Sequence, residues 1–199
     1  MTGPFILGLT GSIGMGKSAV AHMLRNCGVP VFDADAAVHV LQAPGSSLLP
    51  AIEAAFPGTT SPDGVVRQEL GARVFGDRAA LARLEAIMHP AVAVMRADFL
   101  SEHADTPLVA FDIPLLYEKS HGAGLDAVLV VSAPAAVQRA RVLARPGMTE
   151  AKFDQILALQ VPDAEKRARA DYVIDTGCAL EETERAIAAL VSKLRTVAA

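Results

Sequence analysis

The chain has 199 residues, of which 52% are hydrophobic and 20% charged, so it is long enough to close a substantial core and too apolar for a disordered chain. Its formal net charge of -4 provides no global basic field for nucleic acid or anionic lipid, and its apolar runs are shorter than a membrane span. No secretory signal is evident and the two cysteines lie far apart in sequence, so we expect a cytoplasmic protein without a zinc knuckle, nucleic-acid partner or membrane partner.

Five short apolar runs predict the strands of a parallel sheet, because each is brief and mostly lacks the alternation of a half-buried strand. The predicted strands are Phe5–Thr10, Val29–Phe32, Leu108–Asp112, Ala127–Ser132 and Tyr172–Asp175. Helical patterns between these runs, and a final helix over residues 180–195, predict an α/β fold in three layers.

The first predicted strand leads into a P-loop pattern: Gly11, four further residues, then Gly16, Lys17 and Ser18, with a helix expected over residues 17–26. Glycines let the backbone N–H groups turn inward around phosphate oxygens, Lys17 can reach the β- and γ-phosphates, and the Ser18 hydroxyl suits Mg²⁺. The residues expected to bind nucleotide are Gly11, Ser12, Ile13, Gly14, Met15, Gly16, Lys17, Ser18 and Ala19. The alternative is a glycine-rich turn that binds no ligand.

The kind of nucleotide follows from one missing motif. The single asparagine, Asn26, lies in the first predicted helix, so the Asn-Lys-x-Asp motif that reads guanine in GTPases is absent. The sequence therefore favours ATP, bound by a P-loop NTPase core.

Asp33 follows the second predicted strand and is our candidate general base. Ligands bind beyond the carboxyl ends of parallel strands, so this carboxylate should face the same crevice as the P-loop, where it can take the proton of an acceptor hydroxyl. Asp35 either caps the following helix or contacts substrate. His39 lies on the same helix face, with a structural role as its alternative.

The interval between the second and third strands indicates an insertion. Residues 35–106 contain no convincing strand and carry helical patterns near residues 47–56, 67–75 and 78–100, interrupted by a loop at residues 57–64. We interpret residues 35–106 as a helical, acceptor-binding insertion, and residues 1–34 and 107–199 as the nucleotide-binding core.

Charged residues in the second half complete the predicted site. Asp112 ends the third strand and is a candidate for holding metal-bound water. A helix over residues 134–144 and the segment after it carry Arg139, Arg141 and Arg145, which fit a lid at roughly residues 140–165 that folds over the phosphates. Arg141 and Arg145 are four residues apart, so one helix face could present both. The alternative is a solvated basic face.

Several motifs together resemble the dephospho-coenzyme A kinase family over nearly the whole chain. They are Gly8-Leu9-Thr10-Gly11, Ile13-Gly14, Gly16-Lys17-Ser18, Asp33-Ala34-Asp35 with His39, Leu84-Glu85, His89-Pro90, Pro114-Leu115-Leu116 with Glu118, Arg141, Arg145, Gln160 and Asp171 through Asp175. The resemblance implies ATP- and Mg²⁺-dependent phosphorylation of the ribose 3′-hydroxyl of dephospho-CoA, with Asp33 as base and with Lys17, Arg141 and Arg145 in catalysis and ATP binding. It also implies acceptor contacts from Asp33, Asp35, His39, His89, Pro114, Leu115 and Leu116, and metal contacts from Ser18 and Asp112.

Two other interpretations remain open. Another P-loop kinase, acting on a small molecule or a nucleoside monophosphate, would share the P-loop, the acceptor-side carboxylate and the lid arginines. A nucleotide-binding regulator without a second substrate would not need Asp33.

Overall fold

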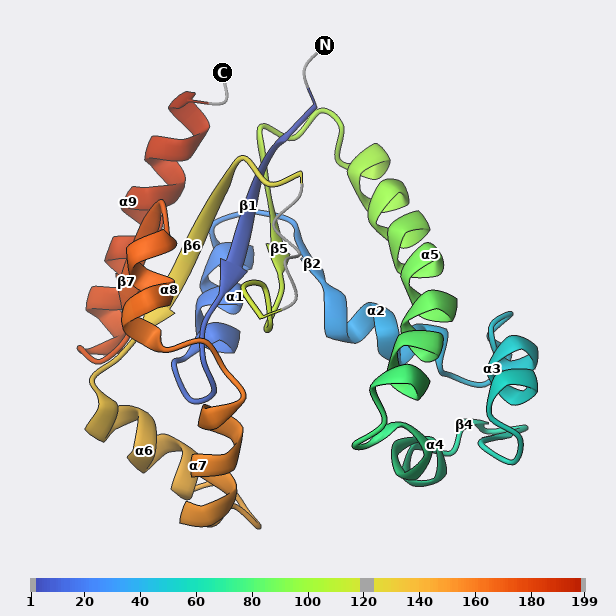
Figure 1. The fold of residues 1–199 in the computed structure, drawn as a ribbon. Helices are drawn as coiled ribbons and strands as arrows, with labels where there is room; N and C mark the ends of the chain where they lie inside the picture. Colours follow the sequence, from blue (N-terminus) through green and yellow to red (C-terminus); the bar gives the residue numbers. More distant parts are fainter. Residues whose placement is uncertain (1–2, 119–123, 198–199) are drawn as a thin grey trace. The chain divides into compact units, whose positions relative to one another are not determined.

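A five-stranded parallel sheet organises the first of two units in this protein, whose structure is a computed structural model describing residues 3–118 and 124–197 (Figure 1). Unit 1 comprises the described residues up to Phe32 and from His103 onward, and unit 2 comprises Asp33–Glu102. Each unit has its own cluster of buried apolar side chains. Each can therefore be treated as a packed body in its own right.

The strands of the sheet lie in the order β2-β5-β1-β6-β7. Their bounds are Phe5–Thr10 for β1, Val31–Asp33 for β2, Leu108–Asp112 for β5, Ala127–Ser132 for β6 and Tyr172–Asp175 for β7. Strand β1 pairs in parallel with β5 on one side and with β6 on the other. The loop after β1 therefore leaves from the middle of the carboxyl edge, as the predicted α/β fold requires.

Strand β2 begins two residues later than the sequence predicts. Val29 is buried, but its N–H donates to Leu24 O at 3.0 Å, so it belongs to the turn that closes the preceding helix. Pro30 has no N–H to donate and contributes only its carbonyl, which accepts from Ala110 N at 2.9 Å. The strand consequently runs from Val31 to Asp33.

Five helices accompany the sheet among the described residues of unit 1. They are α1 (Lys17–Asn26), α6 (Ala135–Leu143), α7 (Glu150–Ala158), α8 (Asp163–Arg169) and α9 (Leu180–Val197). Helices α1 and α9 pack on one another and on one face of the sheet, where alternate strand residues such as Leu7, Leu129 and Val131 meet Leu24 and Val191. Helix α8 packs on β6, and α6 packs on α7.

Unit 2 is mostly helical and contains a small hairpin that the sequence analysis does not predict. Its elements are α2 (Ala34–Leu41), α3 (Leu49–Ala55), β3 (Thr60–Ser61), β4 (Gly64–Val65), α4 (Arg67–Val74) and α5 (Arg78–Glu102). The expected loop at residues 57–64 therefore includes an antiparallel strand pair. The Glu53 carboxylate holds the segment that leads into β3 by accepting from Gly58 N at 2.7 Å and from Thr60 N at 3.0 Å, and in the turn itself Ser61 Oγ accepts from Asp63 N at 3.2 Å. Side-chain hydrogen bonds at Glu53 and Ser61, together with the backbone bond from Val65 N to Gln42 O at 2.9 Å, hold the hairpin without a run of apolar residues.

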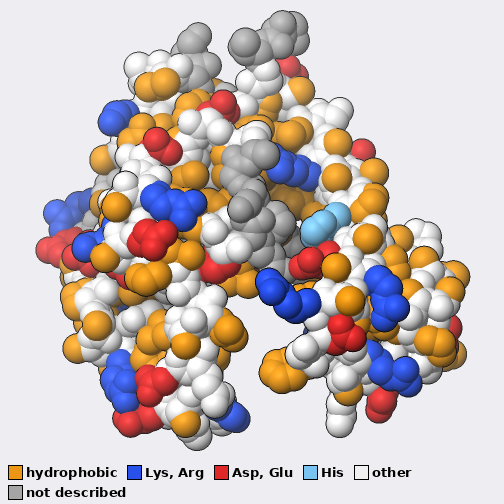
Figure 2. Space-filling view, viewed as in Figure 1, with side chains coloured by type: hydrophobic (Ala, Val, Ile, Leu, Met, Phe, Trp, Pro, Cys, Tyr) orange, Lys and Arg blue, Asp and Glu red, His pale blue; other side chains and the backbone are white. Residues whose placement is uncertain are grey.

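The surface carries charges of both signs. On the face drawn in Figure 2, acidic and basic side chains are interspersed with apolar ones on each unit, without a large field of one sign. Across the described residues, no helix is both long and apolar enough to cross a lipid bilayer.

Candidate active site

The P-loop joins β1 to α1 (Figure 1) and its glycines adopt conformations that other residues rarely reach. Gly14 and Gly16 have φ angles of +77° and +84°, and a Cβ on Gly14 would lie 2.5 Å from Val142 Cγ2. Gly16 is the N-cap of α1, with no side chain capping the helix. The loop therefore needs glycine both for its backbone conformation and for the space around it.

Several N–H groups of this loop are available to an anion. Within the described residues, the N–H groups of Gly14, Gly16, Lys17 and Ser18 donate to no protein acceptor. They lie at the start of α1, where the helix dipole adds partial positive charge. Inward N–H groups at a helix N-terminus suit phosphate oxygens.

Two other residues of the loop, Ile13 and Met15, form hydrogen bonds with the protein. Ile13 N donates to Gln160 Oε1 at 3.1 Å, and Gln138 Nε2 donates to Ile13 O at 2.8 Å. Met15 is 2% exposed, its N–H donates to Ser12 O at 3.1 Å, and its sulfur accepts from Ala133 N at 3.1 Å. Ile13 and Met15 therefore shape the loop, although the sequence analysis counts them among the nucleotide contacts.

The predicted phosphate lysine and the predicted metal carboxylate form an ion pair. Lys17 Nζ lies 2.5 Å from Asp112 Oδ1, with side-chain exposures of 18% and 5%. The sheet register explains this proximity, because Asp112 pairs with Leu9, close to the start of the P-loop. Ser18 directly follows Lys17 in the sequence, and its side chain is exposed. Hydroxyl and carboxylate oxygens are the donors that Mg²⁺ prefers, so the residues present fit this ion chemically.

The arginines of the predicted lid have three different environments. Arg141 reaches the residue after β7, where its Nη2 donates to Thr176 O at 2.6 Å and its Nη1 to Thr176 Oγ1 at 3.3 Å. Arg139 pairs with Glu150 at 2.8 Å on the surface. Arg145 is exposed and lies beyond α6, which ends at Leu143, so the predicted common helix face of Arg141 and Arg145 is wrong. Pro146 and Gly147 follow at once and prevent the helix from continuing.

Thr176 connects Arg141 to the P-loop. Its Oγ1 donates to Met15 O at 2.8 Å and lies 3.2 Å from Ser132 O, and its N–H donates to Ser132 O at 2.8 Å. Thr176 is not among the site residues predicted from the sequence. Its position directly after a strand, at the carboxyl edge of the sheet, is the signal that could have found it.

Asp33, at the end of β2, caps the first helix of unit 2. Its Oδ1 accepts from Ala36 N at 2.9 Å, while its Oδ2 has no hydrogen-bond partner among the residues described. The alternative that Asp35 caps this helix is therefore wrong, because Asp35 lies inside the first turn of α2. Strand β2 ends at Asp33 and α2 begins at Ala34, so the N-cap is Asp33, two positions before Asp35. Asp35 and His39 are exposed along α2, and His89 is exposed on α5.

The segment after β5 contributes both packing and surface. Leu116 is 1% exposed, so its side chain belongs to the interior of unit 1. Pro114 and Leu115 are partly exposed, and Pro114 O accepts from Thr10 Oγ1 at 3.2 Å. Of the three predicted acceptor contacts in this segment, Pro114 and Leu115 remain accessible to a ligand.

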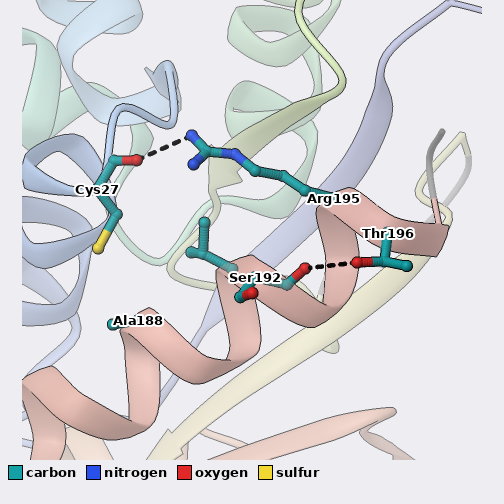
Figure 3. A pocket seen from close by; sticks show the side chains of 6 residues that line it. Cys27, Ala188, Ser192, Arg195 and Thr196 are labelled. Carbon is teal, nitrogen blue, oxygen red and sulfur yellow. Dashed lines mark hydrogen bonds between the residues drawn. The ribbon is translucent and has the colours of Figure 1, made fainter.

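A groove at the opposite end of α1 differs in character from the P-loop. It is lined by Cys27 and by α9 residues that include Val191, Ser192 and Arg195 (Figure 3). Arg195 Nη2 donates to Cys27 O at 2.8 Å and lies 3.2 Å from Gly28 O. A cation bound to carbonyls at a helix C-terminus stabilises that end, so this groove is explained by the contact between α1 and α9.

Comparisons with known proteins identify a family of kinases for a chain with this P-loop. The sequence model of the dephospho-CoA kinase family matches residues 5–182. The dephospho-CoA kinase of Novosphingobium aromaticivorans is 74% identical over 98% of this chain and 97% of its own length. The dephospho-CoA kinase of Mesorhizobium japonicum is 55% identical over 96% of each chain. A crystal structure of a Thermus thermophilus protein is similar with a TM-score of 0.85 and 36% identity, over 97% of this chain and 99% of that one.

Proposed function

The chain belongs to the dephospho-CoA kinase family, and on this premise we propose that it transfers the γ-phosphoryl group of ATP to the ribose 3′-hydroxyl of dephospho-CoA, which gives CoA. The observation that carries this proposal is a P-loop whose N–H groups at Gly14, Gly16, Lys17 and Ser18 are unpaired within the described residues, in a chain matched to the family over residues 5–182. Anion-binding N–H groups at a helix N-terminus are what a nucleotide triphosphate requires.

Lys17 and the loop amides bind the β- and γ-phosphates of ATP in this proposal. Lys17 is held by Asp112, so the ammonium group is already at the carboxyl edge of the sheet before a phosphate arrives. Ser18 and Asp112 would hold Mg²⁺, which when bound neutralises charge on the phosphate oxygens. Arg141 and Arg145 are proposed to stabilise charge on the transferred phosphoryl group.

Asp33 is the proposed general base. Its Oδ1 is used in the helix cap, which fixes the side chain and leaves Oδ2 to accept the proton of the acceptor hydroxyl. Asp35, His39, His89, Pro114 and Leu115 are the proposed accessible contacts to dephospho-CoA. Their exposure in the structure supports this role, because a binding residue must be reachable.

The division of labour along the chain remains our interpretation. We propose that residues 35–106 receive the acceptor, that residues 1–34 and 107–199 bind ATP, and that residues 140–165 form a lid over the nucleotide. We also propose that the enzyme acts in the cytoplasm, since its proposed substrates are charged metabolites.

The test is a coupled ADP-release assay with dephospho-CoA, run beside AMP, adenosine, shikimate and gluconate. We expect turnover with dephospho-CoA, and ADP formation only with another acceptor would reject the proposal. Lys17→Ala should weaken binding of ATP, whereas Asp33→Asn should leave ATP binding intact and lower kcat by roughly a hundredfold or more. Asp63→Asn, a matched change in the exposed turn of the unit 2 hairpin, is the control and should retain wild-type turnover.

A further inference from the structure

A buried ion pair in unit 1 has no part in the proposed chemistry. Lys166 Nζ lies 2.7 Å from Glu118 Oε1, and the two side chains are 0% and 10% exposed. Lys166 lies in α8, while Glu118 lies in the segment after β5. The desolvation of two charges offsets much of their attraction, so such a pair is poorly explained by stability alone.

The Glu118 carboxylate also holds the connection between α7 and α8. Val161 N donates to Glu118 Oε1 at 3.0 Å, the same oxygen that meets Lys166. Burial by itself would raise the pKa of Glu118, but the adjacent Lys166 ammonium group and the hydrogen bond from Val161 N–H outweigh it and hold the pKa below its usual value. The charged carboxylate is therefore a strong acceptor for the Val161 amide at neutral pH.

The residue before Val161 reaches the P-loop. Gln160 Oε1 accepts from Ile13 N at 3.1 Å, and Gln138 Nε2 donates to Ile13 O at 2.8 Å. The C=O of Ile13 and the N–H of Gly14 belong to one planar peptide group and point in opposite directions. The Gln138 bond to Ile13 O therefore fixes the direction of the Gly14 N–H, which is unpaired among the described residues, and the Gln160 bond to Ile13 N fixes the preceding peptide between Ser12 and Ile13.

We propose that the Glu118–Lys166 pair is a positioning device for the P-loop: it holds the Gln160–Val161 connection, and Gln160 in turn holds the peptide between Ser12 and Ile13, next to the peptide that presents the Gly14 N–H to phosphate. Glu118, Lys166 and Gln160 are thus positioning residues. The proposal rests on the proposed binding of ATP at this loop, but not on the identity of the phosphate acceptor.

The experiment compares two double variants that both remove the buried charges. Glu118→Leu/Lys166→Met leaves the Val161 amide without its acceptor, whereas Glu118→Gln/Lys166→Met keeps a side-chain oxygen for it. Removing both charges together avoids the isolated buried charge that a single substitution would leave. Gln160→Leu, at a partly exposed position outside a helix, interrupts the same chain of contacts next to the loop.

The measurement is the dissociation constant of a non-hydrolysable ATP analogue by calorimetry, with the KM for dephospho-CoA beside it. We expect the analogue to bind about fivefold more weakly to Gln160→Leu and to the Leu/Met variant, because one hydrogen bond in the positioning chain is lost. The Gln/Met variant should restore binding. The triple variant Glu118→Leu/Lys166→Met/Gln160→Leu should bind the analogue no more weakly than Gln160→Leu alone, and the KM for dephospho-CoA should not change.

Three results would overturn the proposal: unchanged analogue binding in Gln160→Leu, equal weakening in the Gln/Met and Leu/Met variants, or additive effects in the triple variant. Gln160→Leu keeps the test decisive even if a double variant fails to fold. Calorimetry uses no acceptor. If the wild-type protein failed to phosphorylate dephospho-CoA, the proposed function would be rejected, but the measured binding of the ATP analogue would still test the positioning role.

Discussion

At the scale of single residues, Asp33 combines a structural and a proposed chemical role. One carboxylate oxygen caps α2 by accepting from Ala36 N, and the other is our candidate acceptor for the substrate proton. A side chain already fixed by its cap need not be ordered again when the acceptor binds, which favours a short, well-directed proton transfer. The two roles can be separated experimentally: the cap requires a side-chain oxygen that accepts a hydrogen bond, whereas the base requires a carboxylate that accepts a proton.

We predict that Asp33→Ala and Asp33→Asn will differ in stability and agree in activity. Alanine removes the cap and should lower the free energy of unfolding by about 1 kcal/mol, whereas asparagine caps helices about as well as aspartate. Neither residue can act as a base, so both should lose turnover. Urea unfolding monitored by circular dichroism measures the first effect, and an asparagine variant as unstable as the alanine variant would contradict the cap.

The residues that the sequence predicts well are those whose chemistry is local. Gly14 and Gly16 need positive φ angles and Lys17 follows them at a fixed spacing, so the motif contains most of its own geometry. Gln138 and Gln160 contact Ile13 from 125 and 147 positions away, and no periodic pattern reports such a pairing. Gln160 enters the sequence analysis only through the family resemblance, without a role.

At the scale of elements, the turn after β7 braces the P-loop. Thr176 is 7% exposed and its hydroxyl donates to Met15 O while accepting from Arg141. The same side chain lies against Gly16, where an added Cβ would be 3.2 Å from Thr176 Oγ1. The conformation of the loop therefore depends on an element that is distant in sequence.

We predict that Thr176→Val will lower both the stability of the protein and the affinity of the P-loop for an ATP analogue, and that Thr176→Ser will change neither. Valine keeps the shape but leaves the buried Met15 carbonyl without this donor, which should cost about 1 kcal/mol of stability. Binding of an ATP analogue should weaken several-fold in the same variant. Thermal unfolding and calorimetry measure the two effects, and wild-type affinity in Thr176→Val would show that the loop holds its shape unaided.

The sheet strands were predictable as elements because burial on both faces makes each an apolar run. The boundary of β2 was not, since Val29 is as apolar as a strand residue but bonds back to Leu24 in the helix turn. The hairpin of β3 and β4 was missed for a different reason. Each strand has two residues, too few for a periodic signal, and side-chain hydrogen bonds to Glu53 and Ser61 hold the segment.

At the scale of the whole molecule, the two units have independent cores and different compositions of secondary structure. Unit 1 packs helices on a sheet, whereas unit 2 packs α2, α3 and α4 on the long helix α5. The core of unit 2 includes Ile52, Phe56, Leu70 and Met88, with the Arg83 guanidinium 5.5 Å from the centre of the Phe56 ring. Separate cores allow the stability of each unit to change independently of the other.

This organisation leads to a prediction for hydrogen exchange with the two substrates added one at a time. An ATP analogue with Mg²⁺ should slow exchange in the P-loop and at the carboxyl ends of β5 and β7, because ligand binding stabilises the regions that contact it. Dephospho-CoA should slow exchange in α2 and α5 of unit 2. Lys17→Ala should abolish the first effect and preserve the second, since its change lies in unit 1. Protection by dephospho-CoA confined to unit 1 would contradict acceptor binding by residues 35–106, even if the enzyme phosphorylates dephospho-CoA.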